Sequence, residues 1–449
     1  MMAGNPRESR SLPRRRHSFI TPWVVPSQGD KSVQEMQLHK IFKHKRSFGR
    51  SAMTALLLTG FALVGHAQTI NVSTSAELAN AVATANSAGG NRVISIAAGT
   101  YTLADTLYVN APNVTIAGAS GDRTTVVIQG DAMSADAKVK NLIRAAGSNF
   151  VLKDLTLQKS GWHLLQVVGE VNAEAPRISN VVFRDAWEQM LKVTIDQANY
   201  ANHSDNGILE NSLFEYTAGI GPQYYIGGID VHGGTNWIVR NNTFKAIASP
   251  SNSFAEFAVH FWNHSEDPLV EGNIFVNCDR AIGFGLDSRG NDRGIVRNNM
   301  IYHANNGAPF ADVAIYLDDS PGTQIYNNTI FTEHSYPRSI EYRFTTTSGV
   351  LIVNNLANHP VGSRDGATGT VGSNNESASA GWFVNRAQGN LHLTSAIAGV
   401  VDSGRTVAGL TTDIDGVARP QGSGIDIGAD EWGGTASKIP KAPTNVSAQ

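Results

Sequence analysis

The stretch GGIDVHGG carries an aspartate and a histidine two positions apart, Asp230 and His232. Residues two apart in an extended strand point to the same side and lie roughly 7 Å apart. A neutral imidazole can accept a proton near pH 7, and a neighbouring carboxylate can orient the ring and tune its pKa. The pair therefore suits proton abstraction from a bound molecule, provided that the chain holds this strand on an exposed face.

The elements that would position this pair belong to a repeat. Short apolar segments such as WIVRNNTF, GIVRNNMI and TQIYNNTI recur at intervals of 26 to 31 residues, and one slot aligns in all of them. A period of this length, with strand-like segments and no sustained helical periodicity, predicts a β-solenoid. The slot is occupied in chain order by Leu155, Val181, Ser212, Asn242, Asn273, Asn299, Asn328 and Asn355.

The five successive asparagines of this slot are expected to be scaffold. Asparagine tolerates the left-handed backbone conformation of a tight turn, and stacked side-chain amides can bond to one another along a column. This requirement explains the asparagines without any catalytic role. The functional candidates lie instead in the strand that precedes each slot.

That preceding strand carries two inward apolar residues in each repeat, which sets its register. The inward pairs are Leu165/Val167, Leu191/Val193, Ile229/Val231, Val259/Phe261, Ile282/Phe284, Ile315/Leu317 and Ile340/Tyr342. Alternation then places two columns of side chains on the outer side. One column is Gln166, Lys192, Asp230, His260, Gly283, Tyr316 and Glu341, and the other is Val168, Thr194, His232, Trp262, Gly285, Asp318 and Arg343.

Neighbouring rungs of a solenoid lie roughly 4.8 Å apart, so Lys192, Asp230 and His260 are predicted to be vertical neighbours, with His232 and Trp262 beside them. Each residue alone has a plainer interpretation. The aspartate could form an exposed salt bridge of little energetic value with the lysine. Either histidine could be an ordinary surface imidazole, and the tryptophan could pack on a loop or offer a platform to a sugar ring. Together the five favour a functional site.

Two insertions support a groove at this place. Segments 197–205 and 217–227 lengthen only the repeat between Lys192 and Asp230. Longer loops around one face usually build a binding groove. An extended groove on a solenoid suits a linear polymer, so a polysaccharide is the expected partner.

The residue types point first to proton abstraction beside a carboxylate, as at C5 of a uronic acid. Lys192 could neutralise that carboxylate, together with Arg144 if NLIRAAG belongs to the same column. A neutral His232 would then act as base and Asp230 would orient it. The second histidine or Tyr316 could deliver a proton. The residues expected to bind substrate are Trp262, Gln166, Arg144, Tyr316 and Arg343.

The ends of the repeat region carry further signals. Segment 74–90 is the one clear amphipathic helix, with Thr74 and Glu77 as a capping box and Gly89 at its end. It would cover the open edge of the first rung. The chain combines this helix with the asparagine repeat of about 28 residues, the opening AELANAVATA…ISIAAGTYTL and the closing GSGIDIGADEW. In these features it resembles right-handed parallel β-helix carbohydrate-active proteins. The closing motif is typical of exported bacterial members. The resemblance implies an all-β, right-handed parallel β-helix over 68–434, followed by a linker at 435–449.

The Asp-Val-His of the opening stretch is similar to the Asp-Pro-His signature of mannuronan C5-epimerases, which are related in mechanism to alginate lyases. The resemblance implies catalytic roles for Lys192, Asp230, His232 and His260. The chain departs from the family pattern in three places. Val231 replaces the proline, Gly233 stands where an acid is expected, and Gly227 stands where a tyrosine is expected. Tyr224 or Tyr225 could substitute for that tyrosine from the loop.

Two other classes of function stay open. A glycoside hydrolase needs two carboxylates roughly 5 to 10 Å apart, and Asp287, Asp318, Asp319 and Glu341 on later rungs could supply them. The same oxygens could bind calcium, the one metal for which the sequence offers ligands (Asp287, Asp318 and Glu341). The third class is a non-catalytic surface protein that holds glycans through Trp262 and tyrosines.

The composition agrees with an exported, repeat-built chain. It has 449 residues with 44 glycines and 16% charged residues, and Cys278 is its one cysteine, so neither an intrachain disulfide nor a cysteine zinc site is expected. Residues 1–67 read as a leader in which a basic segment precedes a short apolar run, with cleavage near Ala67. The run is too short for a membrane span. We therefore expect a secreted or periplasmic protein.

Charge further limits the partners. The leader holds 11 of the 35 Lys and Arg residues and 3 of the 38 Asp and Glu residues, which leaves 24 basic and 35 acidic residues in the rest of the chain, a net charge near −11. Nucleic-acid binding would need clustered basic residues, so it is not expected. We expect a monomer.

Overall fold

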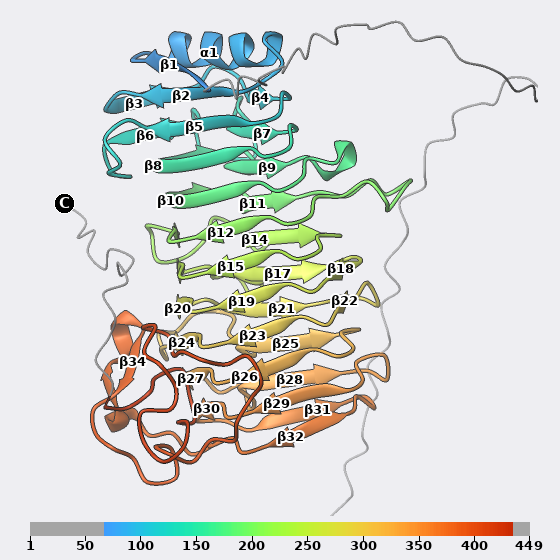
Figure 1. Cartoon of the computed structure of the whole chain (residues 1–449), viewed down its shortest axis with the longest axis vertical. Coiled ribbons are helices and arrows are strands. Elements are labelled where there is room, and N and C mark those ends of the chain that lie inside the picture. The colour runs from blue at the N-terminus through green and yellow to red at the C-terminus, as the bar shows by residue number, and fades with distance from the viewer. Residues whose placement is uncertain (1–66, 434–449) are drawn as a thin grey trace, which may run out of the picture. The chain divides into compact units, whose positions relative to one another are not determined.

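The computed structural model describes residues 67–433, in which the chain winds as a right-handed parallel β-helix with three faces (Figure 1). The predicted fold class is therefore confirmed. The predicted leader and the predicted linker at 435–449 lie outside the described residues, except for the cleavage position at Ala67. No helix among the described residues is long and apolar enough to cross a membrane.

Face 1 is a ten-stranded parallel sheet that holds the outward columns predicted above. Its strands are β4 (Leu107–Val109), β7 (Ile143–Ala145), β9 (Leu165–Val167), β11 (Gln189–Val193), β14 (Gly227–His232), β17 (Val259–Trp262), β21 (Ile282–Phe284), β25 (Ile315–Asp318), β28 (Ile340–Arg343) and β31 (Val361–Arg364).

Faces 2 and 3 follow face 1 in each turn of the chain and are joined by β8 (Val151–Ser160) and β10 (Arg177–Ala186), which run across both. Face 2 has β1 (Gln68–Val72), β2 (Arg92–Ile96), β5 (Val114–Gly118), β12 (Ile208–Glu210), β15 (Ile238–Arg240), β19 (Leu269–Glu271), β23 (Ile295–Arg297), β26 (Gln324–Tyr326), β29 (Val350–Val353) and β32 (Gly369–Gly372). Face 3 has β3 (Gly99–Thr102), β6 (Val126–Gln129), β13 (Leu213–Glu215), β16 (Thr243–Lys245), β20 (Ile274–Val276), β24 (Met300–His303), β27 (Thr329–Thr332) and β30 (Leu356–Ala357). The short strands β18 (Ser265–Glu266) and β22 (Asn291–Asp292) pair beside face 1.

The register predicted for face 1 is confirmed in every pair of strands from β9 to β28. Lys192 pairs with Asp230, which pairs with His260, and His232 pairs with Trp262. Arg144 pairs with Gln166 and so belongs to the same column. The register holds because the inward apolar residues are fully buried, and a slip by one residue would expose all of them.

The asparagine ladder is present, with one correction to its geometry. Each side-chain amide donates to the next amide oxygen at 2.9 to 3.0 Å, from Asn242 through Asn355, and the ladder extends to Asn374. The left-handed residue is not the ladder residue but the one before it, for example Asn241 with a φ of 56°. At this point the chain turns from face 2 to face 3, so each segment predicted as one strand is two, except in β8 and β10, which continue across the turn.

The first turn is covered by α1 (Ser75–Ser87), the predicted capping helix. The Thr74 hydroxyl accepts a hydrogen bond from the Glu77 amide at 3.2 Å, and the Glu77 carboxylate accepts one from the Ser73 amide at 2.7 Å. The helix ends before Gly89, which has a φ of 72°. The helix does not precede the whole solenoid, because β1 comes before it and pairs with β2.

The rungs do not continue to the predicted end of the β-helix at residue 434. The last rung ends at β32, and residues 373–433 fold back, with the antiparallel hairpin of β33 (Phe383–Asn385) and β34 (Asn390–Leu393) beside face 3 (Figure 1). This segment covers outward aromatic side chains, as Phe383 does for Phe331. A buried ion pair of 2.7 Å between Arg419 and Glu431 holds it together. Cys278 is a buried core residue, as predicted, and burial raises its pKa to about 12.

Candidate active site

The predicted cluster is assembled on strands β11, β14 and β17 of face 1. The Lys192 ammonium forms a close ion pair with the Asp230 carboxylate and lies 2.8 Å from Nε2 of His232. The same Nε2 lies 3.4 Å from Oδ2 of Asp230. Three groups that can carry or transfer a proton therefore meet at one point of the sheet, because the solenoid stacks their strands in register.

Asp230 is the buried centre of this group, with 2% of its surface exposed. Burial by itself would raise the pKa of its carboxyl, but the charge of Lys192 is the largest effect that lowers it, and the pKa is held well below its usual range. Nε1 of Trp262 donates a hydrogen bond of 2.8 Å to its Oδ1. The carboxylate is therefore ionised at neutral pH, and the pair with Lys192 is not the exposed salt bridge considered as the plainer interpretation.

Lys192 is held in its charged form. Burial would lower its pKa, but the Asp230 carboxylate, followed by the Tyr225 hydroxyl, outweighs burial and raises the pKa above its usual value. An ammonium with a raised pKa is a poor base at pH 7 and a good partner for an anionic group. The predicted role in carboxylate neutralisation agrees with this state.

His232 is kept neutral. Burial lowers its pKa below the usual value, and the neighbouring Asp230 carboxylate compensates for burial only in part. The Lys192 ammonium can only donate hydrogen bonds, so the nitrogen 2.8 Å from it, Nε2, must accept. The single ring proton of the neutral imidazole is therefore on Nδ1.

The neighbour of Nδ1 is the side-chain amide of Asn263, whose Nδ2 lies 3.1 Å away. The Oδ1 atom of this amide is buried and has no hydrogen-bond partner among the described residues. The oxygen and nitrogen of an amide occupy nearly equal volumes, so rotation of the amide by half a turn lets the oxygen accept the proton of Nδ1. With this rotation both groups are satisfied and the lone pair of Nε2 faces Lys192.

His260 lies beneath the surface of the site. It has no exposed area, and its ring stacks on Trp262 with centroids 5.2 Å apart and contacts Phe257 at 4.9 Å. The Phe257 ring has room because Gly283 follows in the column, where a Cβ atom would lie 2.4 Å from the ring. Nδ1 of His260 lies 3.3 Å from a carboxylate oxygen of Glu256. The predicted transfer of a proton to substrate by this histidine is therefore not supported.

Trp262 is not the exposed platform that the sequence suggested, because only 9% of its surface is exposed. Its ring lies among His232 at 4.5 Å, His260 and the guanidinium of Arg289 at 4.1 Å. Its indole N–H is used by Asp230. Trp262 thus holds the buried carboxylate and supports the imidazole above it.

The turns around face 1 differ from prediction in number. Loops 194–207 and 216–226 come from the predicted insertions, but segments 246–258 and 304–314 are also long, so the insertion is not confined to one repeat. Tyr225, in the 216–226 loop, is 42% exposed and close enough to Lys192 for their charges to interact. Burial raises the pKa of its hydroxyl, which Lys192 partly opposes, so the hydroxyl keeps its proton at pH 7.

The predicted binding residues are distributed along the same face. Gln166 and Arg144 occupy the two rungs before Lys192. Tyr316 lies two rungs beyond His260 and is 8% exposed, beneath the Phe257 ring. Arg343 pairs with Asp365 at 2.5 Å.

Of the carboxylates considered for hydrolysis or calcium, Glu341 and Asp318 are engaged by other groups of the protein. Glu341 is buried and is bound at 3.0 Å by Arg338, Arg364 and the hydroxyl of Tyr336. Asp318 accepts a hydrogen bond of 3.3 Å from the backbone amide of Asp287, and burial raises its pKa. Within residues 67–433 no three His, Cys, Asp or Glu side chains are placed to hold a metal ion.

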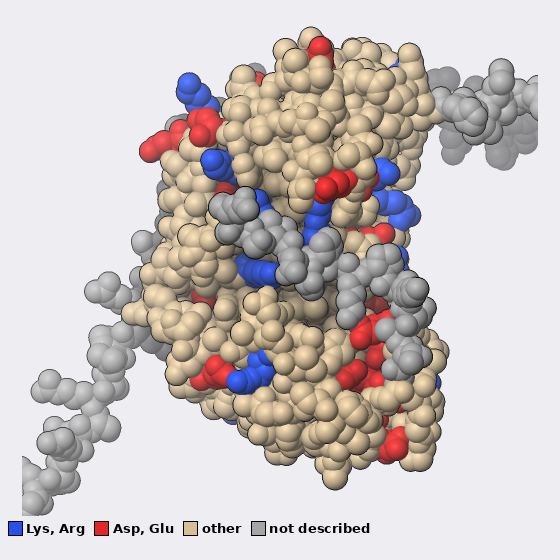
Figure 2. All heavy atoms as spheres, turned by 90° about the vertical axis from the view of Figure 1, so that its left-hand side faces the viewer, with Lys and Arg blue, Asp and Glu red and all other residues tan. Residues whose placement is uncertain are grey.

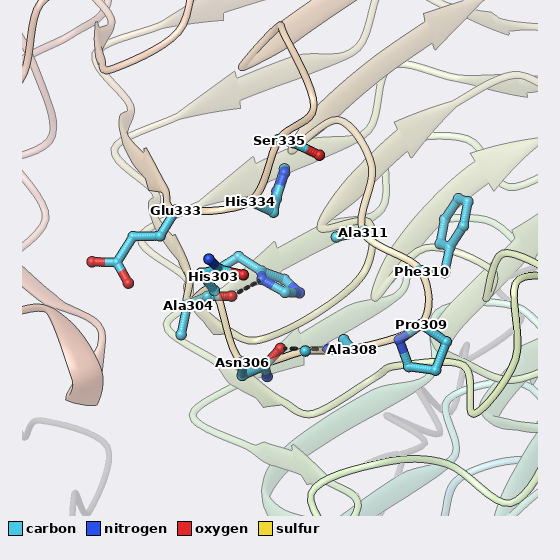
Figure 3. Close-up of a pocket in the computed structure, with 12 residues that line it drawn as sticks. His303, Ala304, Asn306, Ala308, Pro309, Phe310, Ala311, Glu333, His334 and Ser335 are labelled. Atoms are coloured by element: carbon cyan, nitrogen blue, oxygen red, sulfur yellow. Dashed lines mark hydrogen bonds between the residues drawn. The ribbon is translucent and has the colours of Figure 1, made fainter.

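A separate cavity of about 400 Å³ lies between turns 304–311 and 333–335 and contains none of the predicted site residues (Figure 3). His303 is 3% exposed, and its Nδ1 donates to the carbonyl of Ala304 at 2.7 Å. Its Nε2 lies 4.0 Å from the carboxylate of Asp279, whose pKa burial raises to about 7. Burial also lowers the pKa of His334 to about 4. Asp279 and His334 come from irregular turns, where the repeat gives no register, whereas His303 is the last residue of β24.

Three other neighbours of the site could not be predicted from the sequence, because they also lie in turns. Glu256, Asn263 and Arg289 lie in turns before or after strands of face 1, and only the strands have a register that alternation can fix. Tyr225 is one of the two predicted loop substitutes, and the structure places it near Lys192.

No model of a known protein family matches the chain, and no curated protein sequence matches it. Solved structures similar to it include two lyases. A pectate lyase has 14% sequence identity and a TM-score of 0.40, and the match covers 76% of this chain and 88% of the lyase. An alginate lyase from Paenibacillus has 12% identity and a TM-score of 0.38, and the match covers 69% of this chain and 99% of that lyase. A surface adhesin of Streptococcus pneumoniae has 12% identity and a TM-score of 0.43, and the match covers 67% of this chain and 89% of the adhesin. At such identities the likeness concerns the fold alone.

Proposed function

We propose that the protein is an enzyme that removes the C5 proton of a uronic-acid unit in a polysaccharide and so causes β-elimination or C5 epimerisation. The observation that carries this proposal is the neutral His232, whose Nε2 lone pair is held by the charged Lys192 above the buried Asp230. A carboxylate receptor and a neutral base thus stand side by side. On the basis of the predicted leader we also propose that the protein is exported.

The first step is the binding of the uronate carboxylate by Lys192. The ammonium has three N–H donors, and two of them point to Asp230 and His232. A substrate carboxylate is a stronger acceptor than a neutral imidazole, so it takes the hydrogen bond that His232 holds in the free protein. Binding therefore neutralises the carboxylate, which acidifies C5, and at the same moment frees the lone pair of Nε2.

The second step is proton transfer. Nε2 of His232 takes the C5 proton, and the imidazolium that forms is stabilised by Oδ2 of Asp230 at 3.4 Å. In elimination, the C5–H electron pair forms the C4–C5 double bond, the C4–O4 bond breaks and the leaving oxygen takes a proton. Tyr225 keeps its proton at pH 7 and can supply it. In epimerisation, the same hydroxyl returns a proton to the opposite side of C5.

His260 and Trp262 are positioning residues in this scheme. Trp262 fixes Asp230 through its indole N–H at 2.8 Å, and the histidine packs beneath the indole ring. Neither needs to contact substrate. A conservative change at His260 should therefore alter the pH profile and the stability of the site more than substrate affinity.

The experiment is a product screen over polyuronates and glycosaminoglycans with purified protein. An unsaturated product that absorbs in the ultraviolet identifies elimination, and incorporation of deuterium at C5 from heavy water without chain cleavage identifies epimerisation. His232→Gln should abolish either signal, while Lys153→Ala should leave it unchanged, because this side chain is 45% exposed on β8 of face 2 and not on face 1. New reducing ends without absorbance would instead indicate a hydrolase. Binding without any product would indicate a glycan-binding protein, and either result overturns the proposal.

A further inference from the structure

The exposed aromatic side chains of the described residues lie on a strand of face 1 or in the turns that enter and leave this face. Their exposed fractions range from 37% to 54%, although large aromatic side chains are usually covered. They are Tyr108 on β4, Trp162 before β9, Tyr200 after β11, Tyr224 and Tyr225 before β14, Phe254 before β17 and Phe344 after β28. One face of the solenoid therefore carries a series of ring surfaces in contact with solvent.

Cations stand over many of these rings. Of the eight cation–aromatic pairs within residues 67–433, seven lie on face 1 or its flanking turns. Exposed rings take part in four of the seven, with centroid distances between 4.3 and 5.8 Å. These four are Arg144 over Tyr108, Lys140 over Trp162, Arg280 over Phe254 and Arg343 over Phe344.

Two cations of face 2 have acidic partners on adjacent strands. On face 2, Arg240 and Arg297 are paired with glutamates on adjacent strands at 2.7 Å. In the side view of Figure 2, basic and acidic side chains likewise lie interspersed. On face 1 and its flanking turns, Arg280 and Arg343 are also paired, with Asp312 at 2.9 Å and Asp365 at 2.5 Å, whereas Arg144 and Arg289 form no ion pair within residues 67–433. The Nε atom of Arg144 is buried without any hydrogen-bond partner there.

We propose that face 1 binds a long anionic glycan along the solenoid axis through these aromatic–cation pairs, and that the protein acts within such chains rather than at their ends. This inference rests on the proposed function and names its substrate class. Each unit of a polyuronate offers an apolar ring face and a carboxylate. An exposed ring beside a cation offers a matching surface for both.

The spacing sets the length of chain that the surface accepts. The pairs extend from β4 to β28, which are eight rungs apart in the sheet order. At roughly 4.8 Å per rung this is about 38 Å, and an extended glycan advances by roughly one rung per unit, so on the order of eight units would be bound. The Lys192 cluster lies three rungs from β4 and five from β28, and so in the interior of this surface.

The test measures binding of the full chain, with the His232→Gln substitution to prevent turnover, by calorimetry with oligouronates of two, four and eight units. Affinity should rise at least tenfold from four to eight units and fall with added salt. The further substitutions Trp162→Ala and Phe254→Ala together should reduce affinity for eight units at least tenfold and affinity for two units less than twofold. Val384→Ala, an exposed apolar residue of β33 outside face 1, should change neither.

Three outcomes would overturn the inference. These are equal affinity for four and eight units, equal affinity for a neutral glucan of the same length, and tighter binding of a single-stranded oligonucleotide, which also uses rings and cations. The two proposals fail in different ways. Length-dependent binding without turnover of any polyuronate would refute only the proposed function, whereas turnover without length dependence would refute only this inference.

Discussion

Replacement of Lys192 by alanine should destabilise the protein as well as inactivate it. An outer-column position in the sequence predicts that this change leaves thermal stability unaltered. The structure shows instead that the ammonium is the counter-charge of Asp230, which is 2% exposed. Removal of one partner from a buried ion pair costs about 3 to 5 kcal/mol, because the remaining charge is left in a medium of low polarity.

The loss of stability in Lys192→Ala should depend on pH in a definite direction. In the native protein the pKa of Asp230 lies well below 3.8, so its ionisation contributes stability that is present above the unfolded pKa and is lost as the pH falls through the folded one. In Lys192→Ala, burial of the carboxyl is no longer opposed by the ammonium and its pKa rises. The loss of stability should therefore be largest near pH 7 and should shrink toward pH 4, where the carboxyl can be protonated.

The assay is guanidinium unfolding at pH 4 and pH 7, followed by tryptophan fluorescence. Lys192→Met combined with Asp230→Asn removes both charges and should recover most of the stability at pH 7 without recovering activity. Lys153→Ala, an exposed lysine on face 2, is the matched control and should change the unfolding free energy by less than about 0.5 kcal/mol. If Lys192→Ala unfolds at the native midpoint at pH 7, the buried ion pair does not exist and the reasoning fails.

Three further predictions concern other parts of the molecule. His232→Gln should lower turnover by at least about a hundredfold, because it removes the base. The unfolding midpoint should stay nearly unchanged, because the Lys192–Asp230 pair stays intact. Residual activity near the native level would place the base elsewhere. Asn299→Ala should cost about 3 to 5 kcal/mol in unfolding free energy, because it leaves several ladder groups unpaired and opens a cavity, and a loss below about 1 kcal/mol would contradict a continuous ladder. Asp279 has a pKa of about 7 in the folded state against an ordinary value of 3.8, so between these pH values the folded state binds a proton that the unfolded state does not. The free energy of unfolding therefore falls by about 4 kcal/mol as the pH rises through this window. Asp279→Asn should make the melting temperature nearly independent of pH between pH 4 and 8, and parallel curves for the two proteins would refute the shift.

The sequence is sufficient for the register of face 1 because two independent patterns determine it. The repeat length fixes which residues share a column, and the inward apolar pairs fix which side of the strand each residue occupies. Both are properties of strands, where alternation has a period of two. The grouping of Lys192, Asp230 and His232 therefore follows from the sequence alone.

The same reasoning fails for residues whose environment depends on turns. A column position says that His260 points outward, but it does not say that segment 246–258 folds over it and places Phe257 against its ring. The paired asparagines carry two signals that the repeat pattern does not separate. The first of each pair, such as Asn241, takes the left-handed conformation that turns the chain onto face 3, and the second, such as Asn242, joins the ladder.

The arginines of face 1 that form no ion pair suit the charge of the proposed reaction. In the free protein the charges of Lys192 and Asp230 cancel while His232 is neutral, so the cluster has no net charge. A bound uronate adds one negative charge, and proton transfer to the histidine leaves two negative charges on the substrate and one positive charge on the ring. Arg289, over the indole that holds Asp230, and Arg144, two rungs before Lys192, are cations without an acidic partner within residues 67–433 and can offset the added negative charge. An acidic partner on either arginine would cancel this compensation.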